Sequence, residues 1–417
     1  MLKPSIQAMI LAGSRVDELN VLTHYRPKSA VPFGGFCRVI DFALSNLMRS
    51  GIELIAILSQ YRSYSLINHI GTGAAWDMIG RYRGISILPP FKDRDHGDWY
   101  RGTADAVYKN LDFVQYHDPE EILVLSGDHI YQMDYRELIS YHREKGADLT
   151  MAVVEVPPDK SHRFGVAAMD NEDGERGGRV LGYWEKPGEY RSNWASMTIM
   201  CFRPQVLYQA LAANQASESF EFGRDIIPML MARGARIYGY KHRGYWGYTR
   251  TVDEYWQANM DLLGDAPAID MEQWGLRTNL EHRAIRDSQP TLIREQGAVR
   301  NSLLYNGCVI EGEVSNSILF PGVHVGAGAL VENSVLFFNN VVEPGCLLNK
   351  VVGDVNTRYG AGSLVGAAPG ETAAPVTVVG WNNQVPPGSR IGAGATIFPR
   401  IGAEFWPQVV EAGRTLS

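Results

Sequence analysis

The chain has 417 residues, which is enough for two domains with sizeable cores. Its hydrophobic fraction of 45% and charged fraction of 20% are those of an ordinary globular protein. A formal net charge of -7, without any long run of lysine or arginine, argues against nucleic acid or a membrane surface as a partner. The sequence shows no signal-peptide core and no apolar stretch of membrane-spanning length, so we expect a cytoplasmic location.

Four cysteines are scattered along the chain without the close spacing of a metal-binding pair. They are Cys37, Cys201, Cys308 and Cys346. This pattern predicts reduced, packed thiols rather than disulfides or a metal site.

Up to about residue 262, apolar runs typical of strands alternate with segments of helical period. The alternation predicts an α/β, Rossmann-like domain whose mostly parallel sheet carries helices on both faces. We expect strands at residues 6–11, 53–58, 121–126 and 148–154, and helices at residues 39–49, 104–116 and 135–145. Ligands of such sheets bind beyond the carboxyl ends of the strands, where Gly13 and Asp128 would lie.

A different texture begins near residue 295. Short aliphatic units recur there at roughly six-residue steps, as at residues 317–319, 323–326 and 391–397. Loose glycine-rich loops would not keep aliphatic residues in phase, so the rhythm predicts a left-handed parallel β-helix. The predicted organisation is therefore an α/β domain at 1–263, a linker at 264–294 and a β-helix domain at 295–417, with an exposed loop near 366–375.

Several motifs in fixed order resemble those of the glucose-1-phosphate adenylyltransferase family, also called ADP-glucose pyrophosphorylase, over nearly the whole chain. They include PFGG at 32–35, IDFALSN at 40–46, WYRGTADAVY at 99–108, SGDHIYQMDY at 126–135, EKP at 185–187 and YWQAN at 255–259. The resemblance implies a nucleotidyltransferase that makes ADP-glucose and pyrophosphate from ATP and glucose 1-phosphate for glycogen or starch synthesis. It also implies homotetramers or heterotetramers under allosteric control.

The same resemblance implies site residues. Lys28 matches a phosphate-contacting catalytic lysine, although a solvated surface lysine is the plainer alternative, and Asp128 matches the first carboxylate for Mg²⁺. The positions matching the nucleotide contacts are Leu11, Ala12, Gly13, Gln60, Gly102 and Thr103. The positions matching the sugar-phosphate contacts are Gly165, Glu185, Lys186 and Ser196.

The chain departs from the family pattern where phosphate and metal are handled. A phosphate loop needs glycines and cations, but Ser14 and Val16 add side chains, and the catalytic arginine falls on Glu18. Two like charges about 4 Å apart cost about 4 kcal/mol at an effective dielectric of about 20, so this carboxylate would repel a triphosphate. Arg15 is a less favoured substitute for the arginine.

The second metal carboxylate falls on Tyr248, and a neutral phenol is a poor ligand for Mg²⁺. Arg250 replaces a glycine and would crowd the same place.

These losses favour a catalytically impaired, regulatory subunit that assembles with a catalytic paralogue or as a homotetramer. It would bind ATP, sugar phosphate or an anionic effector, with Arg38, Arg62 and Arg400 as candidate effector contacts. Effector coupling is a free energy between sites, so an inactive subunit can contribute to it. The alternative is an active adenylyltransferase with an atypical phosphate and metal site. An acyltransferase that uses His324 on the coils is a third, weaker reading.

Overall fold

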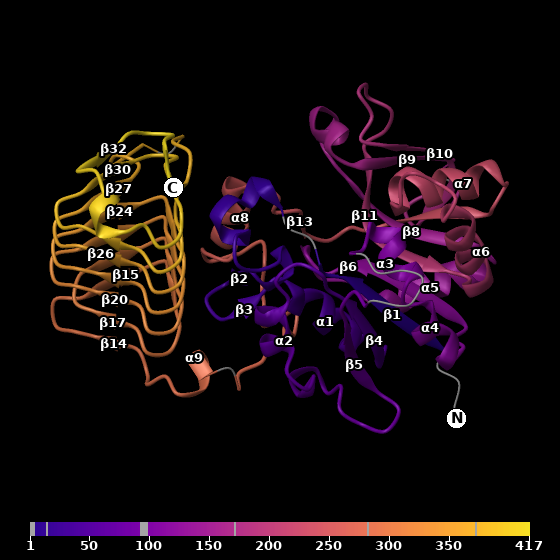
Figure 1. Ribbon diagram of the computed structural model, residues 1–417, viewed down its shortest axis with the longest axis horizontal. Coiled ribbons are helices and arrows are strands. Elements are labelled where there is room, and N and C mark those ends of the chain that lie inside the picture. Colours follow the sequence, from indigo (N-terminus) through magenta and orange to yellow (C-terminus); the bar gives the residue numbers. More distant parts are fainter. Residues whose placement is uncertain (1–4, 14–15, 92–98, 171, 282, 372) are drawn as a thin grey trace. The chain divides into compact units, whose positions relative to one another are not determined.

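The computed structural model describes residues 5–13, 16–91, 99–170, 172–281, 283–371 and 373–417 (Figure 1). The chain forms two compact units. The sheet unit contains Met1–Ser14, Phe42–Ser63 and Gly71–Trp246, and the coil unit contains Arg15–Asp41, Tyr64–Ile70 and Gly247–Ser417. No helix in the described part of the chain is long and apolar enough to cross a membrane.

The sheet unit is built on one nine-stranded sheet. Its strands, in spatial order, are β5 (Gly84–Leu88), β4 (Leu54–Leu58), β1 (Ile6–Leu11), β6 (Glu121–Ser126), β11 (Trp194–Phe202), β8 (Leu149–Glu155), β12 (Ile237–Lys241), β10 (Gly177–Glu185) and β9 (Gly165–Met169).

The four predicted strands are confirmed as β1, β4, β6 and β8. β1 lies between β4 and β6, parallel to both, and its residues are almost all buried, as its apolar sequence requires. β10 and β11 run antiparallel to their neighbours, which the alternation of apolar runs did not indicate. The sheet is therefore α/β and mostly parallel, as predicted, with two reversed strands in its second half.

Helices of the sheet unit pack against the sheet (Figure 1). They are α1 (Ile40–Arg49), which begins in the coil unit, α3 (Thr103–Tyr108), α4 (Leu111–His117), α5 (Tyr135–Glu144), α6 (Pro204–Asn214) and α7 (Ile227–Ala232). Short elements of the unit are η3 (Ala74–Trp76), β7 (Ile130–Tyr131), η4 (Pro158–Arg163) and η5 (Phe222–Ile226), and β13 (Trp246–Gly247) ends it.

The single helix predicted at 104–116 is wrong, because the chain leaves helical geometry at Asn110 (φ -116°, ψ 20°). The amide of the Asn110 side chain donates 2.8 Å to the Ala106 carbonyl and 3.0 Å to the Tyr100 hydroxyl. An asparagine that bonds the backbone in this way competes with the helix, so α3 and α4 are separate.

The coil unit begins with segments that precede its coils in the sequence. They are η1 (Asp17–Thr23), η2 (Lys28–Ala30), β2 (Pro32–Phe33), β3 (Cys37–Arg38), α2 (Tyr64–Ile70), α8 (Val252–Met260) and α9 (Arg283–Arg286). Thr251 and Glu254 form a reciprocal capping box that fixes the start of α8.

The coils stack along one axis, and their strands pair from coil to coil into three parallel sheets (Figure 1). The first coil sheet contains β14 (Leu292–Ile293), β17 (Val309–Ile310), β20 (His324–Val325), β23 (Val341–Val342), β26 (Arg358–Tyr359) and β29 (Gln384–Val385). The second contains β15 (Ala298–Arg300), β18 (Glu313–Ser315), β21 (Leu330–Glu332), β24 (Leu347–Asn349), β27 (Leu364–Gly366), β30 (Arg390–Gly392) and β32 (Val409–Val410). The third contains β16 (Leu303–Leu304), β19 (Ile318–Leu319), β22 (Val335–Leu336), β25 (Val351–Gly353), β28 (Thr377–Val379), β31 (Thr396–Ile397) and β33 (Thr415–Leu416), and the short η6 (Ala403–Phe405) precedes β32.

This arrangement confirms the predicted parallel β-helix. Aliphatic residues at the predicted rhythm point inward and form one core, as Val331, Leu348 and Val365 do in successive coils. The predicted loop near 366–375 corresponds to the connection between β27 and β28. Because of this connection, the residue that pairs with Val351 in the next coil is Thr377.

The corners of the coils require a left-handed backbone, which explains their asparagines and glycines. One corner column is occupied in successive coils by Gly307, Gly322, Asn339, Asn356, Asn382 and Arg400, all with positive φ. Glycine and asparagine adopt this conformation at little cost, whereas other residues are strained there. The sequence therefore specifies the turns of the helix as well as its core.

Candidate functional site

The nucleotide side of the candidate site begins where β1 ends. Ala12 donates its backbone N–H to the Leu58 carbonyl (3.0 Å), and a Cβ atom at Gly13 would lie 2.7 Å from the backbone nitrogen of Gln60. The Gln60 side chain in turn accepts from the Tyr100 N–H and donates to the Tyr100 carbonyl. Glycine at 13 therefore allows the segments after β1 and β4 to approach closely, and Gln60 ties them to the residues before Gly102.

Gly102 and Thr103 lie against the segment before η5. A Cβ atom at Gly102 would lie 2.3 Å from the Phe220 carbonyl oxygen, so only glycine fits there. The Glu221 carboxylate accepts from the Thr103 hydroxyl (2.6 Å) and from its backbone N–H (3.2 Å). Glu221 was not singled out from the sequence, because it lies 118 residues from its partner and in no motif.

Asp128 follows β6 at the same edge of the sheet as Gly13. β1 and β6 are parallel with Leu11 opposite Ser126, so the two residues lie two positions beyond paired strand ends. The Asp128 carboxylate accepts a short hydrogen bond from the Ser126 hydroxyl and lies 3.4 Å from Nε2 of His129. The expected juxtaposition of Gly13 and Asp128 is thus present.

Three of the residues predicted to contact a sugar phosphate, Gly165, Glu185 and Ser196, gather around Tyr183. Glu185 is paired with Gly165 across β10 and β9, and its carboxylate accepts from the Tyr183 hydroxyl (3.1 Å). Burial, and then the nearby Glu185 carboxylate, raise the pKa of Tyr183 well above its usual value, while a hydrogen bond with Ser196 opposes the rise.

Two glycines make room for the Glu185 carboxylate. A Cβ atom at Gly165 would lie 2.7 Å from Glu185 Oε2, and one at Gly223 would lie 2.2 Å from the same atom. A cavity of about 480 Å³ opens beside Glu185 and is also lined by Trp184, Pro187 and Arg224. The pocket thus has the concave shape and the polar anchor of a small-ligand site.

Lys186 lies at the rim of this group rather than inside it. Its backbone is left-handed (φ 47°), its side chain is 49% exposed, and its Nζ atom lies 4.0 Å from Glu185 Oε1. The ammonium group is therefore half-exposed beside the Glu185 carboxylate.

In the coil unit, Lys28 is buried and bonded to the backbone of residue 248. Lys28 is only 2% exposed. Its Nζ atom donates a hydrogen bond of 2.6 Å to the Tyr248 carbonyl and lies 5.2 Å from the centre of the Tyr248 ring. The alternative interpretation of Lys28 as a solvated surface lysine is wrong, since η2 and its surroundings cover it.

Arg250 bonds to both Glu18 and Tyr248 in the same unit. The Arg250 guanidinium donates 2.8 Å to Glu18 through Nε and 3.2 Å to the Tyr248 hydroxyl through Nη1. Burial would lower the pKa of Arg250, but the hydrogen bonds with Tyr248 and Glu18 outweigh it, so the pKa is raised. We call Glu18, Lys28, Tyr248 and Arg250 the substituted cluster.

Two comparisons with known proteins bear on this geometry. The family of nucleotidyl transferases matches residues 7–264, and the family described as GlmU-like, C-terminal hexapeptide matches residues 289–380. The glucose-1-phosphate adenylyltransferase of Desulfitobacterium hafniense (strain Y51) is 38% identical over 95% of this chain and 99% of its own length. That of Clostridium novyi (strain NT) is 41% identical over 79% of this chain and 85% of its own.

The chain belongs to the glucose-1-phosphate adenylyltransferase family. The hexapeptide match agrees with the left-handed form of the β-helix. Two members of the substituted cluster, Glu18 and Tyr248, stand at the positions where the resemblance leads us to expect an arginine and an aspartate. The sequence shows that Arg250 replaces a glycine. It does not reveal that Arg250 pairs with Glu18, because the two residues are 232 positions apart.

The remaining sequence-based candidates have separate outcomes. Ser14 and Arg15 lie outside the described residues. Arg38 donates 2.6 Å to the Ala30 carbonyl, and burial, followed by the charge of Arg26, lowers its pKa to about 10. Arg400 lies 4.8 Å from the Trp381 ring, and Arg62 lies 5.9 Å from the Tyr61 ring.

His324, the candidate residue of an acyltransferase, lies on the outside of β20. Its side chain is 43% exposed and its Nε2 atom lies 3.8 Å from Glu311. The four cysteines are free and buried, as predicted for packed thiols.

Proposed function

We propose that this chain is a regulatory, catalytically impaired subunit of ADP-glucose pyrophosphorylase. The single observation that carries the proposal is the substituted cluster. Three of its members, Glu18, Tyr248 and Arg250, differ from the family pattern, and Arg250 donates hydrogen bonds to the other two. Side chains that compensate one another in this way are consistent with a stable state that does not need the lost groups.

The charges of the cluster support the proposed loss of phosphate transfer. Glu18 carries a negative charge where the family pattern has a cation. The Nε–H of Arg250 donates to the Glu18 carboxylate and so does not contact a phosphate. The buried ammonium of Lys28 donates to a backbone carbonyl. Phosphoryl-type transfer depends on cations placed against the phosphates, so donors engaged in this way hold the reacting phosphate poorly.

The residues do not fit a Mg²⁺ ion of the kind that the family implies. Magnesium prefers several oxygen ligands, mainly carboxylates and water. Among the described residues no group of three or more histidine, cysteine, aspartate or glutamate side chains could hold a metal. Tyr248 offers a phenol, and the guanidinium of Arg250 donates to that phenol. We therefore derive no metal-dependent step for this chain.

Ligand binding does not require the lost groups. The close approach at Gly13 and Gly102 and the cavity beside Glu185 support this view, because the resemblance assigns Gly13 and Gly102 to nucleotide contacts and Glu185 to sugar-phosphate contacts. A subunit that binds such a ligand without turning it over shifts the states that it shares with its partners. We propose a catalytic paralogue in a heterotetramer as the partner, with ATP, a sugar phosphate or another anion as effector, in the cytoplasm.

The proposal is tested by mixing. The pure chain, a catalytic paralogue from the same source and their mixture are assayed for ADP-glucose formation with ATP, glucose 1-phosphate and Mg²⁺, over a range of anionic effectors. A regulatory subunit gives negligible product alone and changes the effector response or the affinity of the paralogue. A mixture that behaves as the paralogue alone contradicts the proposal.

A second candidate is an active adenylyltransferase with an atypical phosphate and metal site. The observation that favours it is Arg250, whose side chain is 34% exposed and keeps a guanidinium beside Glu18. In this case Arg250→Ala removes the turnover of the pure chain, and the change Glu18→Arg with Tyr248→Asp and Arg250→Gly alters it little. In the regulatory case only the triple change raises turnover.

A further inference from the structure

The sheet unit contains a second cavity, larger than the one beside Glu185. Its volume is about 770 Å³, and the residues that line it all belong to the sheet unit. Among the described residues, its lining shares none with the cavity beside Glu185 or with the substituted cluster. The volume lies within the range of small-molecule sites. The cavity is therefore a separate place with room for a small ligand.

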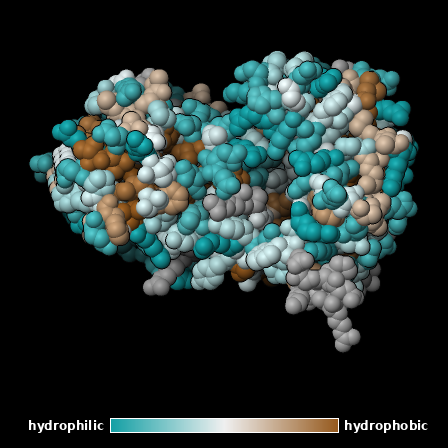
Figure 2. Space-filling view, turned by 45° about the horizontal axis from the view of Figure 1, so that its top comes forward, coloured by the Kyte–Doolittle hydropathy of each residue, from teal (hydrophilic) through white to brown (hydrophobic). Residues whose placement is uncertain are grey.

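Cations from four separate segments of the chain converge on this cavity. They are Arg49 at the end of α1, Arg136 in the first turn of α5, Arg176 just before β10, and Lys241 and Arg243 at and beyond the end of β12. Hydrophilic residues are spread widely over the surface (Figure 2), so single charges are common there. What distinguishes this place is that cations distant in sequence line one concave surface. We call it the basic cavity.

The carboxylates of the lining do not balance these cations. They belong to Asp134, Glu137 and Glu175, so five cationic and three anionic side chains leave a local charge of +2. Burial lowers the pKa of His242, which also lines the cavity, so this ring adds no charge near pH 7. A local excess of positive charge in a chain of formal net charge -7 favours a ligand with at least two negative charges.

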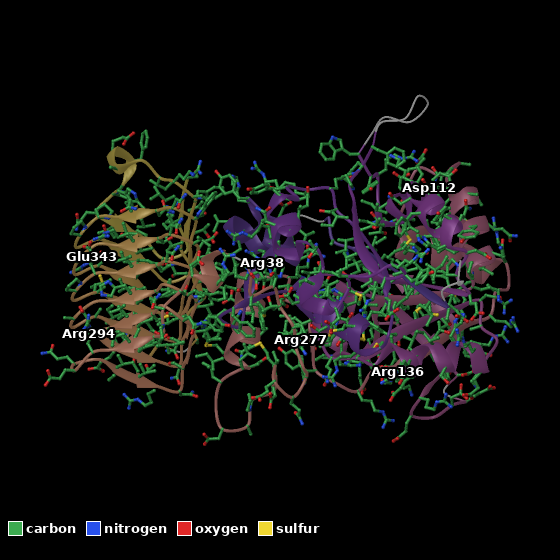
Figure 3. All side chains as sticks on the ribbon, turned by 90° about the horizontal axis from the view of Figure 1, so that it is seen from below. Arg38, Asp112, Arg136, Arg277, Arg294 and Glu343 are labelled. Atoms are coloured by element: carbon green, nitrogen blue, oxygen red, sulfur yellow. The ribbon has the colours of Figure 1, made fainter. Side chains whose placement is uncertain are left out.

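Ion pairs at the basic cavity are exposed. Arg243 lies 2.8 Å from the Glu175 carboxylate, and these side chains are 58% and 84% exposed. Arg136 is 68% exposed and donates 2.9 Å to Asp134 through Nε; Figure 3 shows Arg136 on the sheet unit. Exposed pairs of this kind contribute little to stability. The guanidinium groups therefore exchange a carboxylate of the chain for a bound anion at low cost.

Other side chains of the basic cavity are held in place. Tyr240 donates 2.8 Å to Glu137. Lys241 donates 2.8 Å to the Gly174 carbonyl, and its Nζ atom lies 4.7 Å from the centre of the Trp194 ring. The position of the ammonium group is thus fixed before a ligand binds, which reduces the entropy cost of binding.

We infer that the basic cavity binds a small anion with two or more phosphate groups. The planar guanidinium of arginine matches the oxygens of a phosphate or a carboxylate with paired hydrogen bonds. A phosphate group carries up to two negative charges and three acceptor oxygens, whereas a carboxylate carries one charge and two oxygens. Phosphate therefore competes better against the resident carboxylates. The site lies apart from the substituted cluster, so the inference stands whether or not the chain turns over substrate.

Titration of the full chain with inorganic tripolyphosphate tests the site. Binding is followed by calorimetry in a metal-free buffer. Arg136→Gln and Arg243→Gln each remove an exposed guanidinium and are expected to raise the Kd at least about tenfold. Arg233→Gln, at an exposed arginine of the same unit outside the cavity, leaves the Kd unchanged. A wild-type chain that does not bind tripolyphosphate, or wild-type affinity in either cavity variant, overturns the inference.

Glu175→Gln gives an opposite effect that loss of folding cannot imitate. It removes a carboxylate that competes for Arg243 and is expected to lower the Kd about threefold or more. Glu218→Gln, at an exposed carboxylate outside the cavity, leaves the Kd unchanged. Unchanged or weaker binding by Glu175→Gln contradicts the inference.

Citrate separates phosphate from carboxylate as the preferred group. It carries three carboxylates and is expected to bind at least about tenfold more weakly than tripolyphosphate, because each of its groups brings less charge to the arginines. Equal binding of citrate would indicate a site for anions in general and would overturn the assignment to phosphate.

Discussion

Glu18 and Arg250 both depart from the family pattern, which leads one to expect an arginine at position 18 and a glycine at position 250. Considered alone, Glu18 would repel a triphosphate and Arg250 would crowd a metal site. In the structure the two form a hydrogen-bonded ion pair, and Arg250 also donates to the Tyr248 hydroxyl. The two residues therefore have to be considered together: the ion pair reduces the repulsion expected from Glu18 alone, and it also engages the guanidinium that could otherwise contact a phosphate.

The buried ion pair of Arg26 with Asp354 anchors the first segments of the coil unit to the β-helix. Its charged atoms lie 2.8 Å apart and both side chains are almost fully buried, with Nη1 of Arg26 left without a partner among the described residues. Removing one charge leaves the other buried and uncompensated, which costs about 3–5 kcal/mol. We predict that Asp354→Asn lowers the free energy of unfolding by about 3 kcal/mol or more, measured by urea titration.

The matched control is Glu144→Gln in the exposed pair with Arg176, which should change the same quantity within experimental error. Equal stability of Asp354→Asn and wild type would show that the buried pair does not hold the unit together.

His142 makes the stability of the sheet unit depend on pH. Burial, followed by the charge of Arg203, lowers its pKa to about 4, and its Nδ1 atom lies 2.9 Å from the Thr150 hydroxyl. An unfolded histidine titrates near 6.5, so below that pH the unfolded state binds the proton and the folded state does not. Stability is therefore lost as pH falls from about 6.5 towards 4, by up to about 3 kcal/mol.

The measurement is urea unfolding between pH 7.5 and pH 4.5 for wild type and His142→Gln. The variant lacks the titrating group and should lose less stability over this range. Parallel curves for the two proteins would contradict the assignment.

At the scale of elements, the β-helix was the most predictable part of the chain. Each coil repeats the same local rule, an inward aliphatic residue and a left-handed corner, so the sequence carries the signal many times. The sheet unit was less predictable where tertiary contacts determine the direction of a strand or the end of a helix. Nothing local in β10 or β11 fixes the direction of a strand, and Asn110 breaks a helix through bonds to Ala106 and to Tyr100, ten residues away.

The corner column gives a prediction about local conformation. Asn356 has φ 56°, and its Oδ1 accepts from Asn339 (3.2 Å). Alanine in this conformation costs about 1 kcal/mol or more, whereas glycine does not. Asn356→Ala should lower the free energy of unfolding by about 1 kcal/mol, and Asn356→Gly should leave it within about 0.5 kcal/mol of wild type. Thermal unfolding of both variants checks this, and an equal loss in both would mean that the side-chain bond, not the backbone, matters.

At the scale of the whole molecule, each compact unit is built from segments that are not contiguous in the sequence. Residues 15–41, which carry Glu18 and Lys28, belong to the coil unit with Tyr248 and Arg250, while Gly13, Asp128 and Glu185 belong to the sheet unit. The sequence identified these residues through motifs and through departures from them. It could not identify their partners, since Lys28 and Tyr248 are 220 residues apart and Thr103 and Glu221 are 118 apart. Contacts of that kind depend on the complete fold.

The most direct test of the central claim is the rate of ADP-glucose formation by the pure chain, compared with the triple variant Glu18→Arg, Tyr248→Asp, Arg250→Gly. If the substituted cluster has displaced the groups that act on phosphate and metal, the pure chain turns over on the order of 10³-fold or more below an active family member, and the triple variant regains part of that loss. Turnover of the pure chain comparable with that of an active member, and not raised by the triple change, would contradict the account.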